Sequence, residues 1–246
     1  MKRYKMIVAY DGTNYHGFAR QNEAITVQGT IEKAIKRITQ EEVLTLGAGR
    51  TDAGVHAKGQ CVTFDSETKI PTNRLLKAIN SQLPPDIVVQ SVEEVDDSFH
   101  PRFGAKRKTY RYQIWCGDLP DPFTYRYALH YPYKVNERLM QEAANNMVGE
   151  HDFACFCASG SQVKETVRTI YSIDVKRDGD MIAIDVCGNG FLYNMVRIII
   201  GTLLYVNEGK LSTDDVTQII SGKDRKKAGP TVPPQGLTML SIVYET

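Results

Sequence analysis

Apolar and polar positions along the first hundred residues predict two kinds of secondary structure. Short apolar and β-branched runs, each ended by turn-forming residues, indicate strands at residues 5–10, 43–46, 60–64 and 87–95. Apolar residues at helical spacing indicate one helix after Thr26 and a second helix that begins at Pro71. The resulting order, β-α-β-β-α-β, is typical of a ferredoxin-like unit, in which two helices cover one face of an antiparallel sheet.

The remaining residues repeat this kind of order without an obvious repeat of sequence. Alternating and continuous apolar positions predict strands at residues 109–115, 171–176, 182–186 and 237–244. Helical spacing predicts helices at residues 136–148, 191–206 and 214–220. We therefore expect an α+β fold of two ferredoxin-like, RRM-like halves, whose antiparallel sheets associate and leave a cleft between them. An acidic run that ends at Asp97 suggests a boundary between an N-terminal domain of residues 1–100 and a C-terminal domain of residues 101–246.

Composition is that of an ordinary soluble globular protein, with 42% hydrophobic and 24% charged residues among 246. The longest apolar run, Met195 to Val206, contains Arg197 and is shorter than the roughly 20 residues that cross a bilayer. The apolar stretch at residues 6–10 is too short for the core of a signal peptide. Five cysteines without a CxxC pair fit neither a disulfide framework nor a cysteine-based zinc site. We expect a cytoplasmic protein with no membrane span and no metal.

Net charge alone argues against a nucleic-acid partner, because 30 Lys and Arg residues are balanced by 29 Asp and Glu residues. The local distribution is different, since one short segment carries five cations and no carboxylate. This basic strip consists of Arg102, Lys106, Arg107, Lys108 and Arg111. Phe103, Tyr110 and Tyr112 are interleaved with it, as in a surface that neutralises phosphates and stacks bases. The alternative is a solvated edge strand whose cations discourage aggregation.

The loop at residues 47–56, GAGRTDAGVH, contains three glycines that permit tight turns around a charged centre. This Asp52 loop has neither the glycine spacing of a dinucleotide-binding fingerprint nor the Gly-Lys-Ser/Thr end of a P-loop. Asp52 lies two residues from Arg50, and a guanidinium partner keeps a carboxylate ionised, which suits a nucleophile better than a general acid. The alternative is an Asx-turn aspartate that caps its own loop, with Arg50 in a surface ion pair.

The sequence GRTDAGVHA at residues 49–57 resembles the signature of the TruA family of tRNA pseudouridine synthases over nearly the whole motif. Three further parts of the chain resemble motifs of that family in the same order and spacing. They are FHPRF at residues 99–103 with KTYRY at 108–112, GEHDF at 149–153, and GFLYNMVR at 190–197. The resemblance covers essentially the entire chain.

The resemblance implies a pseudouridine synthase fold and an isomerase that converts uridine to pseudouridine at positions 38 to 40 of the tRNA anticodon stem-loop. It implies that no cofactor or metal is required. It implies that Asp52 is the catalytic nucleophile, that Tyr110 contacts the target base, and that the side chain of Arg197 pairs with the catalytic carboxylate. It also implies a homodimer in which one tRNA spans both subunits.

Pseudouridine formation breaks the N1–C1′ bond of uridine, turns the base and joins C5 to C1′. Attack of Asp52 on C1′, attack on C6, and proton abstraction that leads to a glycal are all compatible with the sequence. The target base must leave the helical stack, which requires a pocket with a stacking platform. Tyr110 is a candidate for this platform, and Phe191 and Leu192 are candidates for an apolar wall that excludes water. Arg50 is a candidate for opening the stack or contacting the phosphate backbone.

Arg197 lies within an apolar predicted helix, where burial of a lone cation is costly, so we expect an anionic partner and nominate Asp52. Snorkelling to the helix surface is the alternative for Arg197, and packing is the alternative for Tyr110. Two other classes of protein stay open. A non-catalytic tandem RRM protein has a similar layout, but the aromatic RNP1 octamer is absent. A glycoside hydrolase generally needs two carboxylates at the scissile bond, and the Asp52 loop offers one.

Overall fold

The computed structural model describes residues 1–160 and 163–244 and divides into two compact units. One unit consists of Met1–Lys106 with Met239–Thr246, and the other consists of Arg107–Thr238. Both units combine helices with mostly antiparallel strands, which confirms the predicted α+β fold class. No helix in the described part of the chain is long and apolar enough to cross a membrane.

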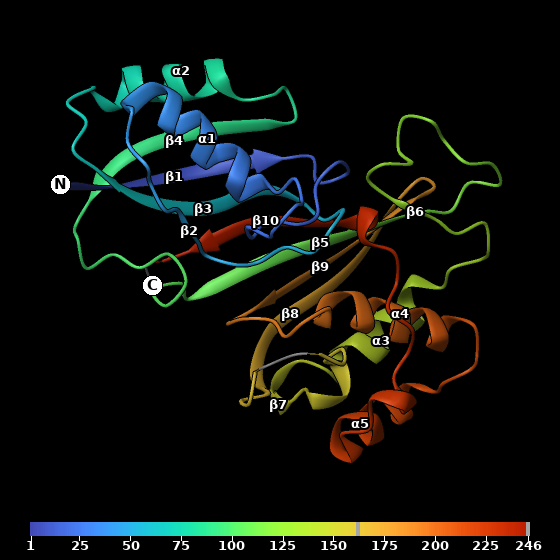
Figure 1. Ribbon diagram of the computed structural model, residues 1–246. Helices are drawn as coiled ribbons and strands as arrows, with labels where there is room; N and C mark the ends of the chain where they lie inside the picture. Colours follow the sequence, from blue (N-terminus) through green and yellow to red (C-terminus); the bar gives the residue numbers. More distant parts are fainter. Residues whose placement is uncertain (161–162, 245–246) are drawn as a thin grey trace. The chain divides into compact units, whose positions relative to one another are not determined.

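The first unit has the β-α-β-β-α-β order that the sequence predicts, followed by a strand from the end of the chain. Its elements are β1 (Lys2–Tyr10), α1 (Val27–Thr39), β2 (Leu46–Gly47), β3 (His56–Ser66), α2 (Thr72–Gln82), β4 (Ile87–Val95) and β10 (Leu237–Val243). The strands lie in the order β4-β1-β3-β10, and β2 also pairs with β3. Alternate residues of β1, from Tyr4 to Tyr10, are buried, and α1 and α2 cover one face of the sheet (Figure 1). The side chain of Thr26 caps α1 by accepting a hydrogen bond from the amide of Gly29 at 3.2 Å.

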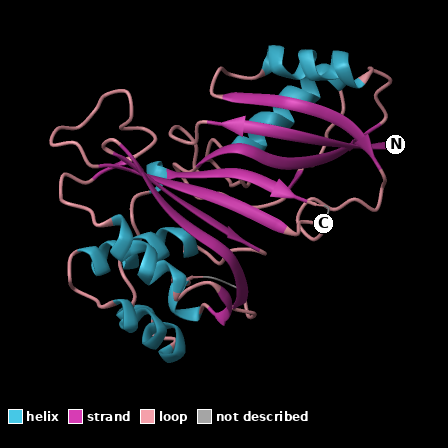
Figure 2. Ribbon diagram, turned by 180° about the vertical axis from the view of Figure 1, so that it is seen from behind, coloured by secondary structure: helices cyan, strands magenta, loops and turns pink. Residues whose placement is uncertain are grey.

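The second unit contains five strands, mostly antiparallel, and three α-helices among its described residues. Its strands are β5 (Arg107–Trp115), β6 (Leu129–His130), β7 (Gly149–Asp152), β8 (Val167–Asp178) and β9 (Met181–Gly188). Its helices are α3 (Glu137–Asn145), α4 (Met195–Asn207) and α5 (Thr213–Gly222), with short 3-10 turns at Ala154–Phe156, Arg225–Lys227 and Pro234–Gly236. The strand order is β5-β9-β8-β7, and β6 runs parallel to β5. Helix α3 packs against β8 and α4, and Figure 2 shows the helices on one side of this sheet.

Several predicted boundaries differ from the structure. Helix α4 begins at Met195 instead of residue 191, because Asn194 adopts a left-handed conformation with φ of 59°, which a helix interior does not accommodate. Helix α3 ends at Asn145, three residues earlier than predicted, and the strand predicted at 43–46 is reduced to β2. The sequence did not predict β6 or β7, which are two and four residues long and too short to show a period.

The division of the chain also differs from the predicted domains of residues 1–100 and 101–246. Residues 239–244 belong to the first unit, in which β10 pairs with β3. The two backbones approach closely at Gly59, where a Cβ atom would lie 2.6 Å from the carbonyl oxygen of Leu240. The chain therefore returns to its first sheet at its end. The expected cleft between associated sheets stays a prediction.

Candidate active site

The backbone of the Asp52 loop is held by residues that follow β1. The amide of Phe18 donates to the carbonyl of Thr51 at 3.0 Å, and the amide of Gly54 donates to the carbonyl of Tyr15 at 3.4 Å. These two hydrogen bonds lie on either side of Asp52, whose side chain is half-buried. The loop therefore presents a carboxylate on a backbone that is fixed before and after it.

Two glycines between β1 and α1 allow this close approach. Gly17 has a φ of +90°, and a Cβ atom there would lie 2.7 Å from the carbonyl oxygen of Thr51. A Cβ atom at Gly12 would lie 2.0 Å from the carbonyl oxygen of Val55. Both contacts require a residue without a side chain. Sequence reasoning missed this support for the loop, although two glycines in a short polar stretch were an available signal.

Buried polar side chains also hold the loop. The Tyr10 hydroxyl lies 2.7 Å from Oγ1 of Thr51, and burial raises the pKa of Tyr10 to about 12, so this hydroxyl is protonated at neutral pH. Nε2 of Gln60 donates to the carbonyl of Gly49 at 2.8 Å. Because a buried hydrogen bond is costly to leave unmade, these contacts fix the start and the centre of the loop.

His56, at the end of the loop, is a buried residue to which sequence reasoning gave no role. Its side chain is 2% exposed. Its Nδ1 accepts a hydrogen bond from the amide of Gly12 at 3.0 Å and lies 3.1 Å from Oδ1 of Asp11. His56 therefore ties the start of β3 to the turn after β1. Arg50, by contrast, is exposed, and its predicted roles in opening the stack or contacting phosphate stay predictions.

In the second unit, the structure brings Tyr110 and Phe191 together. Their ring centroids are 5.2 Å apart and their planes meet at 85°, which is an edge-to-face contact. Tyr110 lies on β5 and is 9% exposed, while Phe191 precedes α4 and is half-buried. A Cβ atom at Gly188 would lie 3.2 Å from the Phe191 ring, so the absence of a side chain leaves room for that ring. Leu192, which follows Phe191 in the sequence, is buried.

Arg197 lies in the first turn of α4, is half-buried, and is held by neighbouring oxygen atoms. Its Nε donates to the carbonyl of Val232 at 2.7 Å, and its Nη1 donates to Oδ1 of Asn194 at 2.7 Å. Both contacts fix the direction of the guanidinium group. The predicted pairing of Arg197 with Asp52 stays a prediction.

The structure distinguishes Arg111 from other members of the basic strip. Nε and Nη2 of Arg111 donate to the two carboxylate oxygens of Asp185, each at 2.7 Å, from β5 to the facing residue of β9. This ion pair raises the pKa of Arg111 and balances its charge within the protein. The exposed members of the strip are Arg102, Lys106 and Arg107, and Lys108 is half-buried. Arg111 is therefore less suited than the exposed Arg102 to contact a phosphate.

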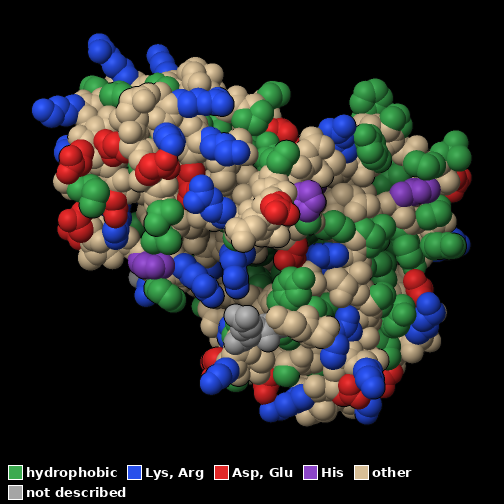
Figure 3. Space-filling view, in the orientation of Figure 1, with side chains coloured by type: hydrophobic (Ala, Val, Ile, Leu, Met, Phe, Trp, Pro, Cys, Tyr) green, Lys and Arg blue, Asp and Glu red, His purple; other side chains and the backbone are tan. Residues whose placement is uncertain are grey.

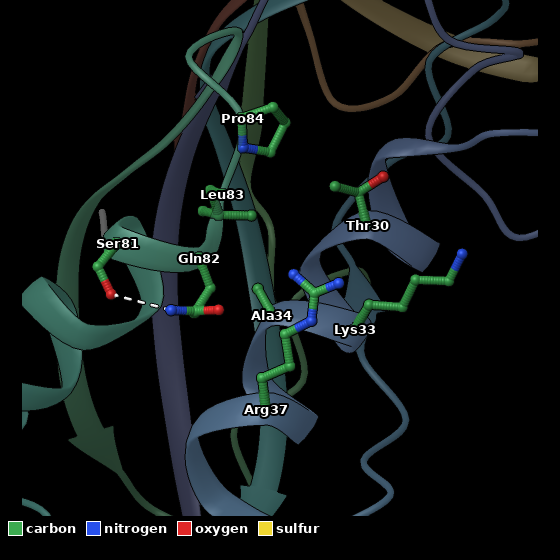
Figure 4. Close-up of a pocket in the computed structure, with 8 residues that line it drawn as sticks. All are labelled: Thr30, Lys33, Ala34, Arg37, Ser81, Gln82, Leu83 and Pro84. Carbon is green, nitrogen blue, oxygen red and sulfur yellow. Dashed lines mark hydrogen bonds between the residues drawn. The ribbon is translucent and has the colours of Figure 1, made fainter.

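A groove of about 410 Å³ lies between α1 and the residues that end α2. Its lining consists of Thr30, Lys33, Ala34, Arg37, Ser81, Gln82, Leu83 and Pro84 (Figure 4). None of the predicted site residues is among these eight. The groove is therefore separate from the catalytic pocket that the sequence predicts.

Comparison with known proteins gives the family of the chain. A family model described as tRNA pseudouridine synthase matches residues 6–104 and 143–245. The tRNA pseudouridine synthase A of Thermoanaerobacter sp. strain X514 is 49% identical over 244 residues, which cover 99% of this chain and 100% of that protein. The protein of the same name from Brevibacillus brevis is 48% identical over the same shares of both chains. The chain belongs to the tRNA pseudouridine synthase family.

Membership confirms the resemblance and the prediction of an isomerase. The family model spans the Asp52 loop and the segment from Phe191 to Arg197, whereas residues 105–142, with Tyr110 and most of the basic strip, lie outside its two matched ranges. Among solved structures, the archaeal box H/ACA sRNP Nop10-Cbf5 complex matches this synthase with a TM-score of 0.36 and 13% identity. That match covers 96% of this chain and 45% of the other and is too weak to carry an argument.

Proposed function

We propose that the chain isomerises uridine to pseudouridine in the anticodon stem-loop of tRNA, at positions 38 to 40, with Asp52 as the nucleophile. The observation that carries this proposal is the Asp52 loop itself. In a chain of this family, it holds a half-buried carboxylate on a backbone that hydrogen bonds fix at Thr51 and Gly54. A nucleophile must meet one carbon atom of a nucleotide turned out of its stack, so a fixed loop supports this role for Asp52.

The proposed reaction rearranges one nucleoside and exchanges one proton with solvent. The N1–C1′ bond breaks, the base turns, and C5 bonds to C1′, while C5 loses a proton to solvent and N1 gains one. Asp52 attacks C1′, attacks C6, or removes a sugar proton on a glycal route. Each route uses one carboxylate and conserves electrons, so the balance requires no oxidant, reductant or second substrate.

Residues of the second unit have supporting roles in this proposal. Tyr110 stacks on the target base, and the edge-to-face contact with Phe191 supports this role because it fixes the Tyr110 ring. Phe191 and Leu192 form an apolar wall that keeps water from the intermediate. Arg197 pairs with the carboxylate of Asp52, and its hydrogen bonds to Val232 and Asn194 support a guanidinium of fixed direction.

Contacts to the tRNA backbone come from Arg50 and from cations of the basic strip. Arg50 contacts phosphate or helps to open the stack, and Arg102, Lys106, Arg107 and Lys108 contact the backbone elsewhere. Arg111 contributes least to this proposal, because Asp185 already balances its charge.

We also propose a homodimer that binds one tRNA across both subunits, and a cytoplasmic location. The five cysteines are free thiols, which fits a reducing compartment. Analytical ultracentrifugation with and without tRNA tests the dimer. The expected complex contains two chains and one tRNA, and a complex of one chain with one tRNA contradicts it.

Tritium release from unmodified tRNA labelled at C5 of uridine tests the reaction. We expect release by the wild type, none by Asp52→Asn, and retained tRNA binding by both. The matched control is Asp96→Asn, since Asp96 is an exposed aspartate whose Oδ1 caps its own turn by accepting the amide of Ser98 at 2.8 Å. This control should release tritium at the wild-type rate.

Each part of the proposal has its own contrary outcome. Release by Asp52→Asn at the wild-type rate excludes Asp52 as the nucleophile. Undiminished release from a tRNA that has cytidine at positions 38 to 40 excludes those positions as targets. Binding of tRNA by the wild type without any release supports the tandem RRM alternative instead.

A further inference from the structure

Phe103 exposes 79% of its surface, although it is a large apolar residue. An exposed aromatic ring contributes little to the stability of a fold, since the gain comes from burial. In sequence it lies between Arg102 and Lys106, which are exposed as well. The ring and its neighbours therefore offer a surface to another molecule.

The turn that carries this ring, at residues 99–104, is organised around His100. Nδ1 of His100 accepts the amide of Arg102 at 3.1 Å and the amide of Phe103 at 3.2 Å. Because Nδ1 acts as the acceptor, the proton of the neutral imidazole is on Nε2. The amide of Gly104 donates to the carbonyl of His100 at 3.0 Å and closes the turn. We call this segment the Phe103 turn.

Tyr244 holds the base of the Phe103 turn. Its hydroxyl donates to the carbonyl of Pro101 at 2.8 Å, and its ring centroid lies 4.9 Å from that of Phe99. Nζ of Lys5 lies 5.4 Å from the centroids of both rings. The protein's own contacts therefore fix the turn, and the display of Phe103 does not require a ligand.

The surroundings of the Phe103 ring combine an aromatic surface with cations. The His100 ring centroid lies 4.4 Å away with 35° between the planes, and the guanidinium carbon of Arg102 lies 5.9 Å from the Phe103 centroid. A nucleotide has the complementary chemistry, because its base stacks on aromatic rings and its phosphate binds cations. A base in a duplex is already stacked on both faces, so the suitable partner is an unpaired base.

A second exposed phenylalanine provides a contrast. Phe123 exposes 88% of its surface, and its amide donates to Oδ1 of Asp121 at 3.0 Å. Figure 3 shows hydrophobic side chains gathered where Figure 1 draws the loops beside β6, which include this segment. A carboxylate bound to the amide of this residue disfavours a phosphate nearby. Exposure alone therefore does not distinguish the two residues, whereas the guanidinium of Arg102 lies beside the Phe103 ring.

We propose that Phe103 stacks on an unpaired nucleobase of the tRNA, while Arg102 and Lys106 contact the phosphates beside that base. The identity of the RNA rests on the proposed function, whereas the stacking contact rests on the Phe103 turn. The contact is a binding contact, and Asp52 remains the group that reacts.

Tryptophan fluorescence tests the stacking directly. The sequence contains one tryptophan, Trp115, so Trp115→Phe provides a background without any. In that background, Phe103→Trp should be quenched by unmodified tRNA, while Phe123→Trp should not. A fully paired RNA duplex should quench Phe103→Trp far less than tRNA. Thermal unfolding of each variant identifies any that fails to fold.

Affinity for tRNA provides a second measurement in the wild-type background. Phe103→Ala should bind about tenfold more weakly, the loss expected when one base loses its aromatic partner, while Phe103→Tyr and Phe123→Ala should bind as the wild type. Unchanged affinity of Phe103→Ala, or equal quenching at the two tryptophan positions, overturns the proposal. A change in emission with protein concentration, without RNA, indicates that a second protein chain covers the ring and overturns it too. Tritium release by the wild type decides the proposed function separately.

Discussion

The Asp52 loop and the Phe103 turn lie in the same unit and each presents one side chain, but they are fixed by different means. The Asp52 loop is fixed by backbone contacts with the segment before α1, where Gly17 leaves no room for a Cβ atom. The Phe103 turn is fixed by two side chains, those of His100 and Tyr244. The first support therefore includes a close fit of two backbones beside the side-chain contacts of Tyr10 and Gln60, whereas the second depends mainly on side-chain hydrogen bonds.

This difference matches the tasks that we propose for the two segments. A nucleophile must reach one atom, and a displacement of about 1 Å can reduce a rate by about a hundredfold. Stacking of an aromatic ring on a base tolerates small shifts and different bases. Changes to the support of the Asp52 loop should therefore cause a large loss of activity, whereas changes to the support of the Phe103 turn should cause a small loss of affinity for tRNA.

The largest expected effect comes from Gly17→Ala. The new Cβ atom would lie 2.7 Å from the carbonyl oxygen of Thr51, at a φ of +90° that alanine disfavours. We expect the free energy of unfolding to fall by about 3 kcal/mol, from backbone strain and steric overlap together. Tritium release by the remaining folded enzyme should fall at least about a hundredfold. Urea unfolding and the tritium assay measure the two effects.

Gly209→Ala is the matched control for this variant. Gly209 also has a positive φ, +71°, but an added Cβ atom meets nothing within 4 Å. We expect a loss of about 1 kcal/mol from the backbone conformation alone, with activity retained. Equal losses of stability and activity in the two variants would show that the close approach of residue 17 to the carbonyl oxygen of Thr51 does not matter.

The sequence predicts those features that depend on local pattern. Strand β4 covers the predicted residues 87–95, because apolar and β-branched residues bounded by turns identify a strand without knowledge of its partners. Asp52 could be nominated because its motif is contiguous in the chain, and its catalytic role stays a prediction. By contrast, the predicted start of α4 was four residues too early, because the left-handed conformation of Asn194 leaves no periodic signal in the sequence.

Features that depend on contacts between distant residues could not be predicted in this way. The support of Thr51 by Phe18 requires the path of two loops, and the pairing of Arg111 with Asp185 requires the register of β5 and β9 across 74 residues. Periodicity identifies the buried face of a strand but not the residue that faces it on its neighbour. The basic strip therefore looked uniform in the sequence, although the structure balances the charge of Arg111.

Tyr10→Phe tests the buried hydroxyl beneath the Asp52 loop through its dependence on pH. Burial raises the pKa of Tyr10 from 10.0 to about 12, so the folded state retains a proton that the unfolded state loses between these pH values. Stability from this group is present below pH 10 and is lost as the pH rises towards 12, by up to about 3 kcal/mol. Loss of the hydrogen bond to Thr51 should make the variant about 1 kcal/mol less stable at pH 7.

The difference between wild type and Tyr10→Phe should therefore narrow or reverse above pH 10. Urea unfolding at pH 7, 9, 10 and 11 measures it. Parallel stability curves for the two proteins would contradict the assigned burial of the hydroxyl.

Tyr244→Phe tests the side-chain support of the Phe103 turn. Removal of the hydroxyl that donates to Pro101 should reduce stability by about 1 kcal/mol and weaken tRNA binding a few-fold, with the tritium rate at saturating tRNA little changed. Tyr4→Phe is the control, because the Tyr4 hydroxyl also donates to a backbone carbonyl in this unit, that of Thr68 at 3.3 Å. The control should lose a similar or smaller amount of stability and keep its affinity, and loss of affinity in both would point to general destabilisation.

The smallest expected effect separates the exposed cation of the Phe103 turn from the paired cation of β5. Arg102→Gln should reduce the slope of log affinity for tRNA against log salt concentration by about one unit, as expected when one phosphate contact is removed. The double variant Arg111→Gln with Asp185→Asn keeps the net charge and removes the ion pair as a whole. Its slope should equal that of the wild type, because a cation balanced by a carboxylate releases few counterions. Filter binding at several salt concentrations measures both slopes. A reduced slope for the double variant together with a wild-type slope for Arg102→Gln would mean that Arg111 leaves Asp185 to contact RNA and that Arg102 contacts none.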